Sequence, residues 1–168
     1  MSTVAIIVAA GRGNRAGGKV AKQWRTIAGK LVVDWSIDAF KSHDLVDFVI
    51  VVLPHDKTLN RNDVITCAGG RSRSISVYNG LIAAKNLSPS KVLIHDVARP
   101  AVSEDIITDI ILAIDEETGA APGLPISDAI WKVSDEEIEK TLDRNLIFRA
   151  QTPQGFPYSK TVSYTHLT

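Results

Sequence analysis

Glycines and basic side chains gather between Ala9 and Trp24, in the stretch AAGRGNRAGGKVAKQW, which directly follows a short apolar run. Glycine lets backbone N–H groups approach phosphate oxygens closely, and basic side chains add the opposite charge. The stretch holds four cations within eleven residues, namely Arg12, Arg15, Lys19 and Lys22. A nucleoside triphosphate carries about four negative charges, so in a partly dry cleft the attraction reaches several kcal/mol. We therefore predict a phosphate-binding loop here.

Two common phosphate-binding patterns overlap in this stretch, and each fails at one point. Gly13 to Lys19 fits the first seven positions of G-x-x-x-x-G-K-[ST], but Val20 stands where a hydroxyl should bind Mg²⁺. Gly11 to Ala16 fits the dinucleotide pattern G-x-G-x-x-G/A, which needs a helix running straight on from the glycines. Gly17-Gly18 would interrupt that helix. The loop thus belongs to neither class.

Further polar groups follow two other parts of the chain. Arg73 and Ser76 come after Gly69-Gly70 and lie three residues apart, so on a helix they share a face. Asp96 follows the apolar run Val92–Ile94, and its carboxylate is the hard oxygen ligand that Mg²⁺ takes. His95 is interpreted as a strand-end residue with a local hydrogen bond.

The elements that must position these groups alternate between strand and helix. Continuous apolar runs predict strands buried on both faces, at 4–8, 48–53 and 92–94. Apolar residues at helical spacing predict helices around 33–40, 77–84 and 106–114, the last capped by Ser103 and stopped by Gly119. We expect an α/β fold, a Rossmann-like, mostly parallel sheet with helices on both faces. Ligands bind such sheets at the carboxyl ends of the strands, near Val8, Gly70 and Ile94.

Residues 126–148 differ in texture from the rest of the chain. Two apolar-containing runs flank a polar tip, Ser134 to Glu137, which predicts a hairpin. We interpret 126–148 as a β-arm that projects from a single domain spanning residues 1–168. Trp35 and Trp131 are expected in core or interface packing.

Composition excludes several classes of protein. Lysine plus arginine equals aspartate plus glutamate at 19 each, so the net charge of zero favours neither a nucleic-acid nor a membrane-surface partner. The apolar start is too short to span a bilayer. Cys67 is the only cysteine, which excludes an intrachain disulfide and fits a reducing cytoplasm. Cys67 itself is expected to be a small buried residue.

Four blocks, in order, resemble the 2-C-methyl-D-erythritol 4-phosphate cytidylyltransferases, a family of the nucleotidyltransferases that activate sugar or polyol phosphates. The blocks are Ala9-Ala10-Gly11-x-Gly13-x-Arg15 with Lys22-Gln23, then Gly69-Gly70-x-x-Arg73-x-x-Ser76-Val77, then His95-Asp96-x-Ala98-Arg99-Pro100, and finally Asp143-Arg144-Asn145 with Gln151-Thr152-Pro153-Gln154. The resemblance runs from about Val4 to Phe156.

The resemblance implies a reaction of non-mevalonate isoprenoid synthesis, in which the phosphate of 2-C-methyl-D-erythritol 4-phosphate attacks the α-phosphorus of CTP and pyrophosphate leaves. The attacking oxygen is already ionised, so catalysis needs positioning and charge stabilisation rather than a general base. By resemblance, Arg15 and Lys22 neutralise the α-phosphate in the transition state.

The resemblance also implies the binding groups. Asp96 would hold Mg²⁺ on the triphosphate. Because the arm crosses to a second subunit in this family, a homodimer is implied, with Arg144 and Thr152 acting at the neighbour's site. The nucleotide would be held by Ala10, Gly11, Gly13, Gly70, Arg73 and Ser76, and the acceptor by Arg99, Arg144 and Thr152.

Three departures from the family pattern bear on function. Ala21 replaces a common proline, and Ala129 replaces a threonine that binds the acceptor, which leaves another polyol phosphate such as ribitol 5-phosphate open. Residues 157–168 fit nothing in the pattern, so we expect a tail unrelated to the family on a domain incomplete at its C-terminus. An inactive nucleotide-binding module is therefore a further alternative.

Overall fold

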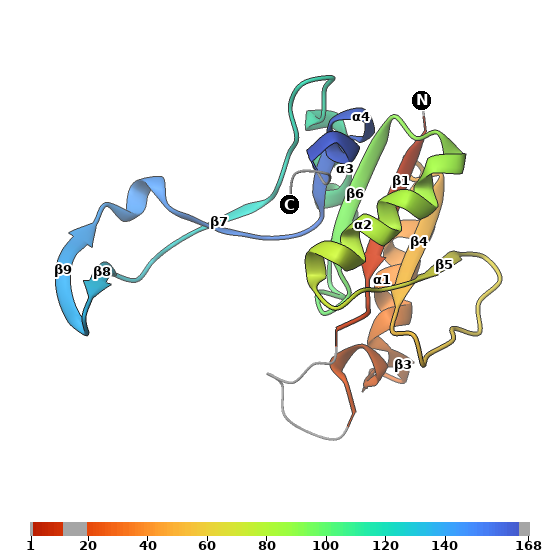
Figure 1. Cartoon of the computed structure of the whole chain (residues 1–168), viewed down its shortest axis with the longest axis horizontal. Helices are drawn as coiled ribbons and strands as arrows, with labels where there is room; N and C mark the ends of the chain where they lie inside the picture. The colour runs from red at the N-terminus through yellow and green to blue at the C-terminus, as the bar shows by residue number, and fades with distance from the viewer. Residues whose placement is uncertain (1, 12–19, 165–168) are drawn as a thin grey trace.

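The fold is built on a five-stranded sheet. The computed structural model describes residues 2–11 and 20–164. The sheet has the order β11-β6-β1-β4-β5, of which Figure 1 labels the last four strands, and within it only β11 is antiparallel to its neighbour. Its strands are β1 Thr3–Val8, β4 Phe48–Leu53, β5 Ile65–Ala68, β6 Lys91–Asp96 and β11 Gln154–Pro157. The predicted mostly parallel α/β sheet is confirmed, and all three predicted strands are present.

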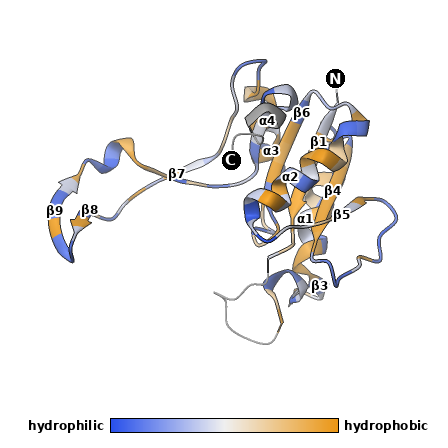
Figure 2. Cartoon of the chain, in the orientation of Figure 1, coloured by the Kyte–Doolittle hydropathy of each residue, from blue (hydrophilic) through white to orange (hydrophobic). Residues whose placement is uncertain are grey.

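Helices cover both faces of the sheet, as predicted. Successive residues of β1 alternate between faces: Ile7 packs toward α1 and α3, and Ile6 toward α2. Both residues are fully buried, which explains why a two-sided strand reads as a continuous apolar run. In Figure 2 the apolar colour is concentrated in these central strands and in the helix faces turned toward them. The helices are α1 Val32–Lys41, α2 Arg73–Ala84, α3 Glu104–Ala113 and α4 Tyr158–Tyr164.

The start of α3 is as predicted, but its end is not. The Ser103 side chain accepts a hydrogen bond from the backbone N–H of Ile106 and so caps the helix. The helix ends at Ala113, because Ile114 turns to an extended conformation and is buried in the core. The expectation that Gly119 stops this helix is therefore wrong. A side chain at Gly119 would meet the Phe156 ring at 2.7 Å, so glycine there permits close packing on β11.

The predicted β-arm is present and projects away from the sheet (Figure 1). Its hairpin pairs β8 Ile130–Ser134 with β9 Glu137–Leu142, and the turn residues Asp135 and Glu136 both have positive φ. The arm is longer than the predicted 126–148, because β7 Gly123–Pro125 and β10 Phe148–Ala150 pair with each other rather than with the main sheet. The 3-10 helix η4 Arg144–Leu146 precedes β10.

Several short elements complete the described chain. The 3-10 helix η2 Lys22–Trp24 precedes α1, and the 3-10 helix η3 Lys85–Leu87 directly follows α2. The short strands β2 Thr26–Ile27 and β3 Lys30–Leu31 form a two-stranded ribbon just before α1. No helix of the described residues combines the length and the apolar character needed to cross a bilayer.

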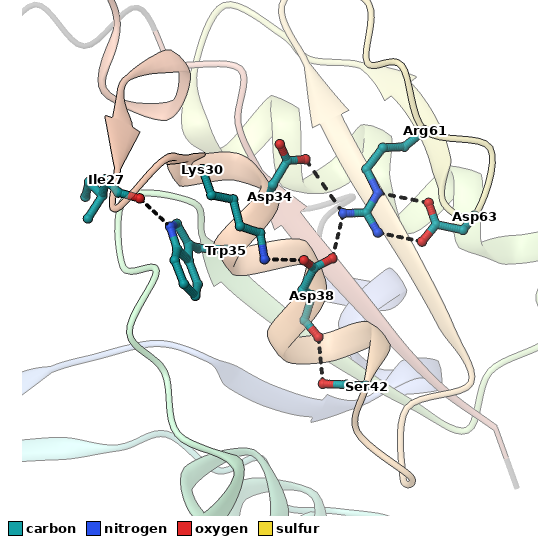
Figure 3. A network of polar contacts seen from close by, with 8 residues as sticks. All are labelled: Ile27, Lys30, Asp34, Trp35, Asp38, Ser42, Arg61 and Asp63. Carbon is teal, nitrogen blue, oxygen red and sulfur yellow. Dashed lines mark hydrogen bonds and ion pairs between the residues drawn. The ribbon is translucent and has the colours of Figure 1, made fainter.

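An ionic cluster joins the loop after β4 to α1 (Figure 3). Arg61 pairs with Asp63 at 2.6 Å and with Asp38 at 2.6 Å, and Asp34 lies 3.7 Å from the same guanidinium. Lys30 pairs with Asp38 from the other side. The hydrogen bond from Arg61 is the main reason that the pKa of Asp63 falls to about 2. The cluster holds the long loop between β4 and β5 against α1. Strand β5, which follows this loop, is itself largely exposed.

The cysteine and two of the tryptophans differ in how far they are buried. Cys67 is half-buried on β5 against the core of the α2 face, and burial raises the pKa of its thiol. Trp35 is at the surface, where its indole N–H donates to the Ile27 carbonyl at 2.9 Å and Lys30 stacks on its ring. Trp131 is 56% exposed on the arm. Neither tryptophan belongs to the core of this chain.

Candidate nucleotide-transfer site

The loops after β1 and β5 meet at the carboxyl edge of the sheet. The Gly69 N–H donates to the Leu53 carbonyl at 2.7 Å, and a side chain on Gly69 would lie only 2.2 Å from Cβ of Ala10. Glycine is thus required for this contact. The neighbouring Gly70 N–H donates to Ser76 Oγ at 3.0 Å. Three of the predicted nucleotide-binding residues, Ala10, Gly70 and Ser76, are therefore adjacent.

Gln23 fixes the start of the glycine-rich loop, a role that sequence reasoning did not assign. Its side chain is 3% exposed, and Nε2 donates to the carbonyls of Ala9 at 2.8 Å and Gly11 at 2.7 Å. The same short helix η2 carries Lys22, which is exposed. The amide thus holds Gly11 and Lys22 in a fixed relation. The sequence marks this place only by the Lys22-Gln23 pair of the first motif block, and the fold shows that the glutamine is buried and the lysine exposed.

The central part of the predicted phosphate loop lies outside the described residues. This part contains Gly13 and Arg15, together with Arg12 and Lys19. Gly11 on one side and Lys22 on the other bracket the segment.

Arg73 and Asp96 form an ion pair between α2 and the end of β6. Arg73 is the first residue of α2, after the N-cap Ser72, and its Nε lies 2.9 Å from Asp96 Oδ1. Both side chains are partly exposed, at 51% and 35%. The fold thus brings the predicted nucleotide residue Arg73 to the predicted metal ligand Asp96.

The donor set around Asp96 fits a magnesium ion that arrives with a phosphate ligand. Among the described residues, no group of three or more His, Cys, Asp or Glu side chains could hold a metal ion. Mg²⁺ commonly takes one or two carboxylates and completes its shell with water and substrate phosphates. A single partly exposed carboxylate at the end of a parallel strand meets that requirement.

His95 is fully buried beneath this site and makes hydrogen bonds through both ring nitrogens. Nε2 lies 3.1 Å from the Arg99 carbonyl, and Nδ1 lies 3.1 Å from Thr152 Oγ1. Burial lowers the pKa of His95 to about 4, against a smaller opposing effect of the bond to Arg99. The predicted local hydrogen bond is confirmed, while the bond to Thr152, 57 residues away in sequence, could not be foreseen.

Thr152 lies in this chain's own site, which corrects the expectation that it reaches the neighbour's. Its hydroxyl accepts the backbone N–H of Asp96 at 3.2 Å, and the residue is 8% exposed. The physical reason is strand β11, which returns from the arm and pairs with β6, so the residues just before it meet the end of β6. Arg99, at the same edge, hydrogen bonds to Gln151.

Arg144 is the one predicted site residue on the arm. It is exposed, and its guanidinium donates to the Ser127 carbonyl of the same arm. The arm that carries Arg144 projects away from the sheet whose strand β6 ends at Asp96 (Figure 1).

A pocket of about 430 Å³ near this site is lined by Lys22, Arg25, Ala98 and Pro100 among others, so it lies between η2 and the loop after Asp96. A larger pocket of about 520 Å³ lies on α1 between Trp35, Asp38 and Val102 and contains none of the predicted site residues. The smaller pocket is the better candidate for substrate, since Lys22 lines it.

Comparison with known proteins agrees with the resemblance carried by the four motif blocks. The family model of 2-C-methyl-D-erythritol 4-phosphate cytidylyltransferase (IspD) matches residues 3–166. This match takes in residues 157–166, which we expected from the sequence to lie outside the family pattern. Consistently, Tyr158 at the start of α4 packs on the core and its hydroxyl donates to the Leu81 carbonyl at 3.0 Å.

Individual relatives agree with this match. The chain is 47% identical to the bifunctional enzyme IspD/IspF of Ruegeria pomeroyi, over 97% of this chain but 44% of that protein. It is 42% identical to a 2-C-methyl-D-erythritol 4-phosphate cytidylyltransferase of Cereibacter sphaeroides, over 94% of this chain and 74% of that one. The crystal structure of the Francisella tularensis cytidylyltransferase (IspD) superposes with a TM-score of 0.81 at 27% identity, covering 99% of this chain and 77% of that chain. The chain thus spans less than half of its bifunctional relatives.

Proposed function

Since the chain belongs to the 2-C-methyl-D-erythritol 4-phosphate cytidylyltransferase family, we propose that it transfers CMP from CTP to 2-C-methyl-D-erythritol 4-phosphate and releases pyrophosphate. The observation that carries the proposal is the meeting of four sequence-distant groups at one sheet edge: the Ala10-Gly11 backbone, Ser76 with Arg73, Asp96, and Thr152. We further propose a cytoplasmic enzyme.

Binding of the nucleotide is assigned to the β1 and β5 loops. We assign the cytosine to the backbone of Ala10 and Gly11 and to the Gly70–Ser76 contact, because a small site built from backbone groups can read the edge of a pyrimidine and exclude a purine by size. Gly13, which lies outside the described residues, is assigned to nucleotide binding by the motif alone. Arg73, at the N-terminus of α2, adds a charge beside this surface.

Catalysis is assigned to fixed positive charge. The attacking phosphate oxygen is already ionised, so the chain needs no general base. Lys22 extends from η2 into the pocket that also reaches Ala98 and Pro100, and Arg15 supplies a second cation to the α-phosphate. A bound Mg²⁺ would neutralise phosphate charge and orient the triphosphate. Asp96 would hold that ion. When the ion binds, Arg73 would leave Asp96 and pair with a phosphate of the nucleotide instead.

The acceptor is assigned to the loop after β6. Arg99 lies on this loop next to the Lys22 pocket and would bind the acceptor's phosphate. Thr152 supports the same edge through its bond to the Asp96 N–H. Arg144 would act at the site of a second copy, since its own arm leads it away from this one.

A homodimer is proposed because the arm exposes apolar surface that no described element of this chain covers. Trp131 and Val133 on β8 and Ile138 on β9 are each more than half exposed, and Val133 pairs directly with Ile138. Leu146 and Phe148, near Arg144, are 84% and 58% exposed. Monomeric proteins rarely leave such a contiguous apolar patch on a two-stranded arm.

The catalytic proposal is tested by pyrophosphate release from CTP, using the complete gene product that contains this chain. Release should require both Mg²⁺ and 2-C-methyl-D-erythritol 4-phosphate. It should fall at least about 100-fold in Arg15→Ala, Lys22→Ala and Asp96→Asn, as for loss of a transition-state donor. Lys41→Ala, an exposed lysine at the end of α1, is the matched control and should keep full activity.

Other outcomes separate the alternatives. Full activity of all three variants would refute the mechanism. Preference for ribitol 5-phosphate in a panel of acceptors would support the substrate suggested by Ala129, and CTP binding without turnover would support an inactive nucleotide-binding module.

The dimer is tested by light scattering of the same protein. Trp131→Glu on the arm should shift a dimer toward monomer because it puts a charge in the apolar interface. Leu112→Glu changes an even more exposed apolar residue, 70% accessible on α3, and should leave the dimer intact. A monomeric wild type, or a dimer unaffected by Trp131→Glu, would count against the arm as the interface.

A further inference from the structure

The hydrogen bonds of His95 and its full burial together select one arrangement of protons. The Arg99 carbonyl can only accept, so His95 Nε2, 3.1 Å away, carries a hydrogen and donates it. Full burial disfavours an imidazolium, so the ring is neutral and Nδ1 is an acceptor. The Thr152 hydroxyl, 3.1 Å from Nδ1, must then donate to it.

The Thr152 oxygen is engaged a second time. It accepts the backbone N–H of Asp96 at 3.2 Å. The hydroxyl therefore receives a bond from Asp96 and gives one to His95. With the Arg99 N–H donating to the Asp96 carbonyl at 3.0 Å, the segment from Asp96 to Arg99 forms a turn that the imidazole closes from beneath.

The ring is held in place by packing as well. Its centroid lies 4.9 Å from that of Phe40 on α1, and both side chains are fully buried. A rigid ring that bonds to one end of a turn directly, and to the other end through the Thr152 hydroxyl, fixes the backbone of that turn. This turn carries Asp96 and Arg99, the proposed ligands of metal and acceptor.

We propose that His95 is a positioning residue, which together with the Thr152 hydroxyl sets Asp96 and Arg99 in register with each other. The inference rests on the proposed cytidylyltransferase function. It assigns His95 neither acid–base chemistry nor a contact with substrate. It also gives the Thr152 hydroxyl an internal role, as the link between the β11 side of the site and the end of β6.

The first test does not require activity. In ¹⁵N spectra of histidine-labelled protein near pH 7, His95 should be the neutral tautomer with hydrogen on Nε2, its signals assigned by their loss in His95→Gln. Thr152→Val should move the Nδ1 resonance because the bond is lost, and Thr152→Ser should move it less. The Nδ1–H tautomer, or an Nδ1 signal unmoved by Thr152→Val, would overturn the proposal whatever the enzyme's substrate.

The second test uses turnover and a matched control. Thr152→Val should lower kcat about 10- to 100-fold, the usual effect of losing an orienting partner, and raise the Mg²⁺ concentration for half-maximal rate. Thr108→Val removes the other threonine–histidine bond, the 3.0 Å contact to His43 Nε2 away from the site, and should leave both values unchanged. If Thr152 bound the acceptor directly, Thr152→Val would instead raise KM for the acceptor alone.

A double-mutant cycle decides between these roles. When Thr152 acts through His95, adding Thr152→Val to His95→Gln should lower kcat little further. Independent, multiplicative losses would contradict the link. Should His95→Gln fail to fold, the comparison of Thr152→Val with Thr152→Ser still decides, since equal losses in kcat and Mg²⁺ dependence would refute a role for the hydroxyl.

Discussion

Arg73 on α2 and Asp96 at the end of β6 are joined by an ion pair of 2.9 Å between Nε and Oδ1, across the carboxyl edge of the sheet. Both residues come from motifs that the sequence placed on separate elements, 23 positions apart. The pair joins the proposed nucleotide-binding helix to the proposed metal ligand.

We predict that this pair matters for activity far more than for stability. Exposed ion pairs contribute about 0–1 kcal/mol, so Arg73→Gln and Asp96→Asn should each change the free energy of unfolding in urea by about 1 kcal/mol or less. Pyrophosphate release should nevertheless fall about 100-fold or more in each. A large loss of stability with activity retained would mean that the pair is structural.

Gln23→Ala should weaken both the fold and nucleotide binding. The change leaves the buried Ala9 carbonyl without its amide donor, which costs about 1–3 kcal/mol, and releases Gly11 from its fixed position. Urea unfolding and the KM for CTP measure the two effects. Gln23→Glu should be at least as harmful, because a carboxylate cannot donate to two carbonyls. An unchanged KM for CTP in both variants would contradict the role of Gln23 in fixing Gly11.

The Arg61 cluster should support the fold only above acidic pH. The pKa of Asp63 is lowered to about 2, first by the hydrogen bond from Arg61. Burial alone would raise the pKa of Asp38, but bonds from Lys30 and Arg61 outweigh it and the pKa falls. A lowered folded-state pKa means that the unfolded chain binds protons first, so stabilisation is present above about pH 4 and is lost as the pH falls toward 2.

Arg61→Met measures this contribution. Wild type should be more stable than the variant at pH 6, and the difference in melting temperature should shrink between pH 4 and pH 2. A difference that stays constant over that range would show that Arg61 acts by packing rather than by charge.

Ala21→Pro should stabilise the chain. Ala21 has φ −60°, which matches the value that proline imposes, so the substitution lowers the entropy of the unfolded chain without strain. The expected gain is about 0.4–1 kcal/mol in thermal unfolding. Ala28→Pro is the matched control: φ there is +49°, so the same substitution should destabilise.

Gly80→Ala should destabilise although alanine favours helices. A Cβ at this position of α2 would lie 2.5 Å from Ile6 Cγ2 and 3.1 Å from Val52 Cγ2 on the sheet. Overpacking costs about 1–3 kcal/mol, against a gain in helix propensity of about 1 kcal/mol. A melting temperature above that of wild type would show that α2 shifts freely on the sheet.

The sequence alone determined the central strands, the three main helices and the motif residues, because these depend on local pattern. Strands β1, β4 and β6 are buried on both faces, so their apolar runs are continuous and easily read. Ser103 capped α3 as expected, since a cap needs only neighbouring residues. The order of the motif blocks indicated the family whose model matches residues 3–166.

Only the tertiary structure decided the features that depend on distant partners. Strand β11 contains Gly155 and Pro157 and has no strand pattern; it forms because the arm returns it to β6. That return places Thr152 in its own site against His95, and it sets Gly119 against Phe156 rather than at a helix end. Gln23 likewise acquires its role only when β1 and η2 pack together. Hydrogen bonds between residues 14 to 57 positions apart leave no local signal, and so they had to be seen in the fold.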